Sequence, residues 1–159
     1  MWGDFEACSN RTRGDALLRA QKRFVGLMAG RHGLYHADPL FARFGVLKVG
    51  DLYRQQLRVH AWRFWHGLLP ENQAAMLRRV GDVHGHATRS AGTGLHVSTR
   101  DHASVGYRVP KEWAGLPGEL REVGSLAAFK RRSRDGFLWG YGVFVCEAMG
   151  CRVCGGDSG

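Results

Sequence analysis

Apolar residues recur at helical spacing through most of this chain, and turn-forming residues separate the apolar runs. Glycine and proline residues mark where these runs begin and end. The pattern predicts a mainly α-helical fold of about five helices. The five helices that we expect cover about residues 15–29, 39–45, 51–69, 70–80 and 125–135, and a short helical segment covers residues 110–113. In the first of these, Leu17, Leu18, Phe24, Val25 and Met28 are expected to face inward.

The longest helix is expected to begin at Asp51 and to end at Pro70, and it has two kinds of surface. Its apolar face would bury three large side chains, and its polar face would keep three arginines in water. The expected buried residues are Leu52, Leu57 and Trp62, and the expected solvated ones are Arg54, Arg58 and Arg63. The tryptophans Trp62 and Trp113, together with Phe64, are expected in the core.

Composition changes after the fourth helix. Residues 81–94 are rich in Gly, His, Thr and Ser, which is typical of a connector. Beyond it, residues 95–99 and 104–109 have strand character, and we expect them to pair as a small β-hairpin. The segments expected are a lead-in (1–13), a helical subdomain (14–80), the connector (81–94), a small helical and extended subdomain (95–138) and a disordered, cysteine-containing tail (139–159).

The charge balance favours a polyanionic partner. The chain has 23 Lys+Arg against 14 Asp+Glu, a formal net charge of 23 − 14 = +9. Most of the cations are arginines, whose planar guanidinium binds phosphate through two hydrogen bonds. A second interpretation is that a bias in the coding DNA raises Arg, Gly and Ala together. The last helix repeats the basic pattern, and with the long helix it would form a groove that attracts RNA or DNA; its cations are Lys130, Arg131, Arg132 and Arg134.

Candidate chemistry is sparse. Cys146, Cys151 and Cys154 have zinc-ligand spacing but supply only three ligands, so reduced thiols in a loose tail compete with a zinc site. No Ser-, His- or Cys-based catalytic pattern is present, and no apolar run has the length of a membrane span or the form of a signal peptide. We therefore expect an intracellular protein, nuclear or cytoplasmic, with no membrane partner and no cofactor other than zinc at the cysteines.

Several short motifs follow one another in an order that resembles the C-terminal region of non-LTR (LINE-type) retrotransposon reverse transcriptases. They are Trp2-Gly3, Leu18 to Gly30, His36 to Phe41, Asp51 to Tyr53, Gly67 to Pro70, His84 to Arg89, Trp113 with Leu116-Pro117, and Ser125 to Lys130. Two positions depart from the family pattern. Ala87 stands before Thr88, where the family often has an apolar or aromatic partner, and Ala114 follows Trp113, where the family usually has Asn. The resemblance covers nearly the whole chain.

The resemblance implies a segment that follows the polymerase, without the catalytic parts themselves. Such polymerases hold two metal ions with paired aspartates, and this sequence contains no Asp-Asp pair. We expect a non-catalytic segment that binds element RNA or target DNA beside a polymerase domain of the parent protein. Two alternatives stay open: a degenerate retroelement relic without selected activity, and a zinc-dependent interaction module.

Overall fold

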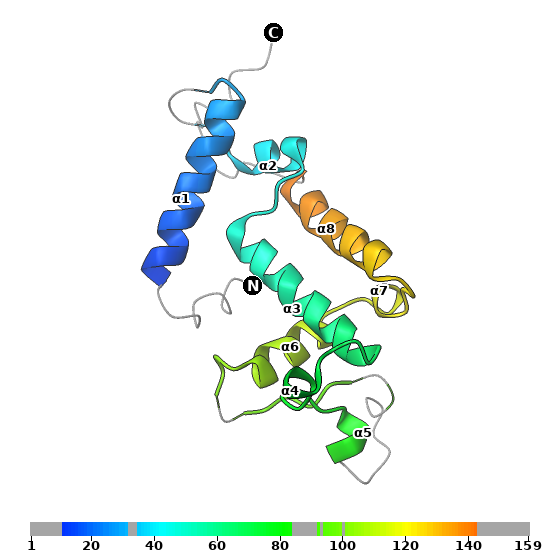
Figure 1. Ribbon diagram of the computed structural model, residues 1–159. Coiled ribbons are helices and arrows are strands. Elements are labelled where there is room, and N and C mark those ends of the chain that lie inside the picture. The colour runs from blue at the N-terminus through cyan, green and yellow to red at the C-terminus, as the bar shows by residue number, and fades with distance from the viewer. Residues whose placement is uncertain (1–10, 32–34, 84–91, 93, 100, 143–159) are drawn as a thin grey trace. The chain divides into compact units, whose positions relative to one another are not determined.

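The computed structural model describes residues 11–31, 35–83, 92, 94–99 and 101–142, and their regular structure is helical (Figure 1). The helices are α1 (Arg11–Met28), α2 (Asp38–Phe44), α3 (Val49–Trp65), α4 (Glu71–Ala74), α5 (Val80–Val83), α6 (Val105–Ala114), α7 (Gly118–Arg121) and α8 (Leu126–Gly142). The predicted mainly helical class is confirmed. Three of these helices have only four residues each, so most of the packing comes from the other five.

The described residues form two compact units, each with its own apolar core. Unit 1 comprises Tyr53–Ser133. Unit 2 comprises residues 11–52 and 134–142, which are far apart in the sequence. These units differ from the segments that we predicted from composition. The boundaries of those segments stay a prediction.

The core of unit 1 is built around aromatic side chains from three helices. Trp62 of α3, Trp113 of α6 and Phe129 of α8 are 3%, 1% and 0% exposed. The ring of Trp65 stacks on that of Trp113 with 5.6 Å between centroids. The indole Nε1 of Trp62 donates to the Val123 carbonyl at 2.9 Å, so the one polar atom of this side chain is satisfied inside the core. The predicted core positions of Trp62 and Trp113 are confirmed, whereas the predicted burial of Leu52 is wrong, because its side chain is 47% exposed.

The core of unit 2 is tied together by one glutamine and one tyrosine. Gln21 of α1 donates to the Leu47 carbonyl at 2.8 Å and accepts from the Val49 amide at 2.9 Å, so it satisfies a donor at the start of α3. Tyr141 of α8 packs edge-on against buried Phe41, with 6.2 Å between ring centroids. The α2 helix ends at Gly45, whose φ of 61° is left-handed, as the predicted glycine stop requires.

The predicted β-hairpin of residues 95–99 and 104–109 is wrong. Residues from Val105 onward form α6. The first segment forms an isolated antiparallel bridge between Leu95 and Arg79, and a single backbone hydrogen bond joins Ser98 to Gly106. Helical spacing explains the outcome, because Val109 and Trp113 are four residues apart and both are buried in unit 1. Pro110 lies inside this helix instead of opening it.

The last helix is longer than expected. We predicted a helix that ends near residue 135 and a disordered, cysteine-containing tail from residue 139, but α8 continues to Gly142. Phe137 and Leu138 pack against the unit 2 core, and Tyr141 is a buried member of it. The helical spacing of these apolar residues outweighs the low helix propensity of the intervening glycines.

The first helix presents its apolar residues differently from the prediction. Val25 is buried, but Leu17, Phe24 and Met28 are 55%, 65% and 52% exposed. The side that packs contains Gly26, where an added Cβ would meet the Tyr35 hydroxyl at 2.0 Å. The helix therefore packs through Val25 and Gly26, and part of the predicted apolar stripe faces solvent.

Tyr141 also gives unit 2 a measurable response to alkaline pH. Its hydroxyl accepts from the Lys48 amide at 3.2 Å and donates to Asp51, and burial first and this hydrogen bond second raise its pKa above the ordinary 10.0. The unfolded chain therefore loses the tyrosine proton near pH 10 while the folded chain keeps it. Stability from this group is complete below pH 10 and falls as the pH rises further.

We expect Tyr141→Phe to lower the free energy of unfolding by about 1–2 kcal/mol at pH 8, because both hydrogen bonds of the hydroxyl are lost. Above pH 10 the difference from the parent protein should shrink, since phenylalanine has no proton to lose. Urea unfolding at pH 8 and at pH 10.5 measures both effects. A difference that grows with pH would contradict the assignment.

Candidate nucleic-acid interface

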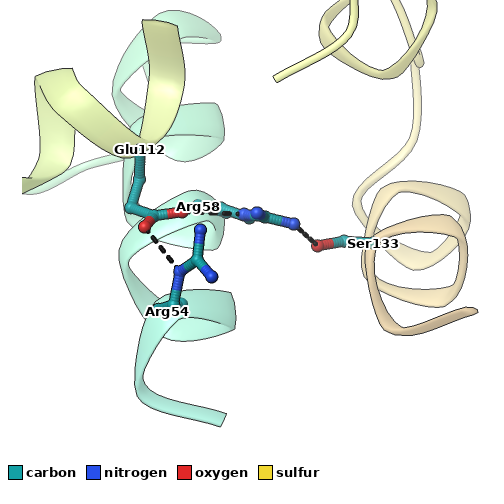
Figure 2. A network of polar contacts seen from close by, with 4 residues as sticks. All are labelled: Arg54, Arg58, Glu112 and Ser133. Carbon is teal, nitrogen blue, oxygen red and sulfur yellow. Dashed lines mark hydrogen bonds and ion pairs between the residues drawn. The ribbon is translucent and has the colours of Figure 1, made fainter. Parts of the chain in front are cut away.

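Two of the predicted phosphate-binding arginines share one carboxylate within unit 1. Arg54 Nε lies 2.8 Å from Glu112 Oε1, and Arg58 Nε lies 3.0 Å from Glu112 Oε2 (Figure 2). One helical turn separates the arginines on α3, so both reach the same residue of α6. Their side chains differ in exposure, 46% for Arg54 and 15% for Arg58. The expectation that Arg58 stays in water is therefore wrong.

Side chains fill the space between α3 and α8 in unit 1. Arg58 reaches across to the Ser133 hydroxyl at 3.5 Å (Figure 2). Gln55 donates to the Lys130 carbonyl at 3.0 Å. The rings of Trp62 and Phe129 lie 6.0 Å apart between the same two helices. These contacts replace the groove that we expected there. Arg54 and Arg58 hold α3, α6 and α8 together, and a role in binding nucleic acid stays a prediction for both.

The remaining predicted cations are exposed. Arg63 on α3 and Lys130, Arg131 and Arg132 on α8 all belong to unit 1 and face solvent, while Ser133 beside them is 1% exposed. Within the described part of the chain, no carboxylate forms an ion pair with these three α8 residues. Arg134, in unit 2, is exposed and donates to the Gly45 carbonyl. The first turns of α8 therefore carry three consecutive cations that are available to an anionic partner.

Sequence reasoning missed a buried arginine. Arg108 of α6 is 7% exposed, donates to the Tyr53 hydroxyl at 2.9 Å and to the His102 carbonyl at 3.1 Å, and holds α6 against α3. The hairpin interpretation hid it, since a strand would have placed Arg108 and Val109 on opposite faces. On a helix they are adjacent, and both are buried.

Sequence reasoning also missed two aromatic residues of unusual environment. His60 of α3 has a buried Nε2 with no hydrogen-bond partner among the described residues. Burial, then the nearby Arg63 charge, lowers the pKa of His60, so the ring is neutral at pH 7. Trp139 of α8 has the opposite character and is 77% exposed. Its place in the expected tail had removed it from consideration.

The zinc prediction lies outside the residues that the structure describes. Cys146, Cys151 and Cys154 all follow Gly142, the last described residue. Within the described ranges, no three His, Cys, Asp or Glu side chains are grouped as metal ligands would be. Zinc at the cysteines therefore stays a prediction.

Comparison with known proteins adds no relative. No family model matches the chain, and comparisons with curated proteins and with solved structures give no match either. The helices of the described part include none that combines the length and the apolar character needed to cross a bilayer.

Proposed function

We propose that this chain is a non-catalytic, nucleic-acid-binding C-terminal segment of a LINE-type reverse transcriptase, with the polymerase supplied elsewhere in the parent protein. The ordered series of short motifs from Trp2 to Lys130 supports the family, and the net charge of +9 supports a polyanionic partner. The main support for a binding surface on α8 is the run of exposed cations at its start, which are Lys130, Arg131 and Arg132.

The placement of these cations suits binding to the phosphate backbone. Phe129 and Ser133, on either side of the run, are 0% and 1% exposed, so the basic segment is anchored to the core of unit 1. An anchored helix loses less side-chain and backbone freedom on binding than a free peptide would. Contacts of this kind hold a strand without reading its sequence, and they release counterions when they form.

We expect binding to RNA or DNA to weaken steeply with salt and the slope to depend on α8. In the double variant Arg131→Gln and Arg132→Gln, loss of two phosphate contacts should reduce the log–log salt slope for a single strand by about 1.4. Affinity at low salt should fall by about tenfold. Fluorescence anisotropy with a labelled oligonucleotide, titrated at several salt concentrations, gives both values.

A matched control separates a local site from general attraction. Arg19→Gln with Arg23→Gln removes the same charge from the exposed surface of α1, so net charge is equal in the two double variants. The α8 variant should lose clearly more affinity than the α1 variant. Equal losses would exclude α8 as the binding surface, and a parent protein whose affinity ignores salt would exclude the proposed function.

A further inference from the structure

Unit 1 contains a cavity of about 420 Å³ whose described lining includes no residue of α3 or α8. The lining comes from three short stretches of chain, one after α4, one around the isolated bridge and one at the start of α6. Its described residues are Met76, Arg78, His96, Ser98 and Gly106. Small-molecule sites in proteins have volumes of about 300–1,000 Å³, so the size of this cavity suits one small ligand.

Backbone hydrogen bonds hold the walls of this cavity together. The His96 amide donates to the Arg78 carbonyl at 2.8 Å, and the Ser98 amide donates to the Gly106 carbonyl at 2.9 Å. The leucines directly before Arg78 and before His96 are both buried in the core of unit 1. The walls are therefore in place before a ligand binds, which lowers the entropic cost of binding.

A glycine keeps the space between two of these walls open. A Cβ added at Gly106 would meet the Met76 carbonyl oxygen at 3.3 Å and the Ser98 Cβ at 3.4 Å. Any side chain at this position would therefore narrow the cavity where the start of α6 meets the other two stretches.

The lining favours an anion. Among its described residues Arg78 carries a permanent charge, and none is a carboxylate. The Arg78 side chain is exposed and makes no hydrogen bond, ion pair or ring contact with another described residue. Its neighbour Arg79 differs, because its Nη2 donates to the Trp65 carbonyl at 3.0 Å and its guanidinium lies over the Trp65 ring. The guanidinium at the cavity is therefore available to a ligand.

A phosphomonoester matches these groups. It carries a charge of about −1.5 to −2 at pH 7 and has three strong acceptor oxygens. A guanidinium binds two such oxygens with a pair of N–H groups, and the Ser98 hydroxyl can donate to the third. Met76, which is 61% exposed, offers an apolar contact to the carbon-containing part of the ligand.

We propose that this cavity binds a phosphomonoester group, with Arg78 as its main ligand. The group belongs either to a free small molecule such as a mononucleotide or to the 5′ end of a nucleic-acid strand. The inference goes beyond the proposed function, because the exposed cations of α8 suit the phosphodiesters of a strand, whereas this cavity accommodates one terminal phosphate.

The test measures the binding of uridine 5′-monophosphate and of uridine by isothermal titration calorimetry. The parent protein should bind the phosphorylated compound more tightly, and Arg78→Gln should weaken that binding by about tenfold. Arg78→Lys, which keeps the charge without the planar fork, should recover part of the loss. Arg23→Gln, which removes the same charge from the exposed surface of α1, should leave the affinity within about twofold of the parent value.

Two labelled oligonucleotides that differ only in a 5′-phosphate identify the source of the group. If the strand end is the ligand, the phosphorylated strand binds more tightly and Arg78→Gln removes the difference. Equal affinities for the two strands, together with binding of uridine 5′-monophosphate, assign the cavity to a free small molecule.

Three results would overturn the phosphate site. They are equal affinity for uridine and its monophosphate, equal losses in Arg78→Gln and Arg23→Gln, and no binding of the monophosphate combined with equal affinity for the two strands. In each case salt-dependent binding of a strand would leave the proposed function standing. Binding of the monophosphate without any binding of a strand would do the reverse. The melting temperature of each variant shows that the fold is retained, as the exposed positions of both arginines predict.

Discussion

Trp113→Ala should lower the free energy of unfolding by about 3–5 kcal/mol, the largest loss that we expect from a single substitution in this chain. The side chain is 1% exposed and is stacked on Trp65, so its removal leaves a large cavity bordered by residues from several helices. Since whole domains are stable by only about 5–15 kcal/mol, the substitution should remove a large share of the stability of unit 1. Urea denaturation followed by circular dichroism measures the change.

Trp139→Ala is the matched control, because it deletes the same side chain at a position that is 77% exposed. Its free energy of unfolding should stay within about 0.5 kcal/mol of the parent value. This comparison also addresses the relic alternative. A degenerate fragment would unfold gradually and respond alike to both substitutions, whereas a selected domain would lose a cooperative transition only with Trp113→Ala.

Glu112→Gln should lower the free energy of unfolding by about 3 kcal/mol, the second largest effect that we expect. The substitution keeps the shape of the side chain but removes the negative charge between Arg54 and Arg58 (Figure 2). Removing one member of a largely buried ion pair is strongly destabilising, because the remaining charge is left without an opposite charge beside it. Chemical denaturation at neutral pH measures the loss.

Arg54 and Arg58 supply an internal comparison for this pair. In double-mutant cycles with Glu112→Gln, Arg58→Met should show the larger coupling energy, because its side chain is 15% exposed against 46% for Arg54. Arg58 also reaches Ser133 of α8, so its loss affects a second helix. No coupling in either cycle would show that solvent screens the carboxylate, and equal couplings would show that burial does not strengthen the pair with Arg58.

The helical elements were predictable where apolar spacing and turn chemistry agree. Pro39 and Gly45 bracket α2, and Ser125 starts α8, where its hydroxyl accepts from the Ala128 amide at 3.3 Å. Both cases depend on neighbours within a few residues. The α6 segment was misjudged because Val105 to Val109 has strand propensity when isolated, and the decisive factor was burial of Val109 and Trp113 against distant parts of unit 1.

The candidate interface was predictable only in part. Sequence reasoning identified the basic run of α8 as a helical surface, and the structure places those residues in solvent. It did not distinguish Arg58 from Arg63, because the partner of Arg58 is Glu112, 54 residues away in the sequence. Ion pairs between distant residues leave no local pattern. The exposure of Trp139 was hidden for a similar reason, since it depends on which side of α8 meets the core of unit 2.

The tie between Tyr141 and the start of α3 has a consequence for the order of events during synthesis. The hydroxyl contacts Lys48, which precedes it by 93 residues, and Tyr53–Ser133, the described part of unit 1, lies between them. A nascent chain emerging from the ribosome therefore contains every residue of Tyr53–Ser133 before the second half of unit 2 exists. Unit 1 can condense around its own tryptophans early, while the first half of unit 2 waits, with its core open, for the last turns of α8.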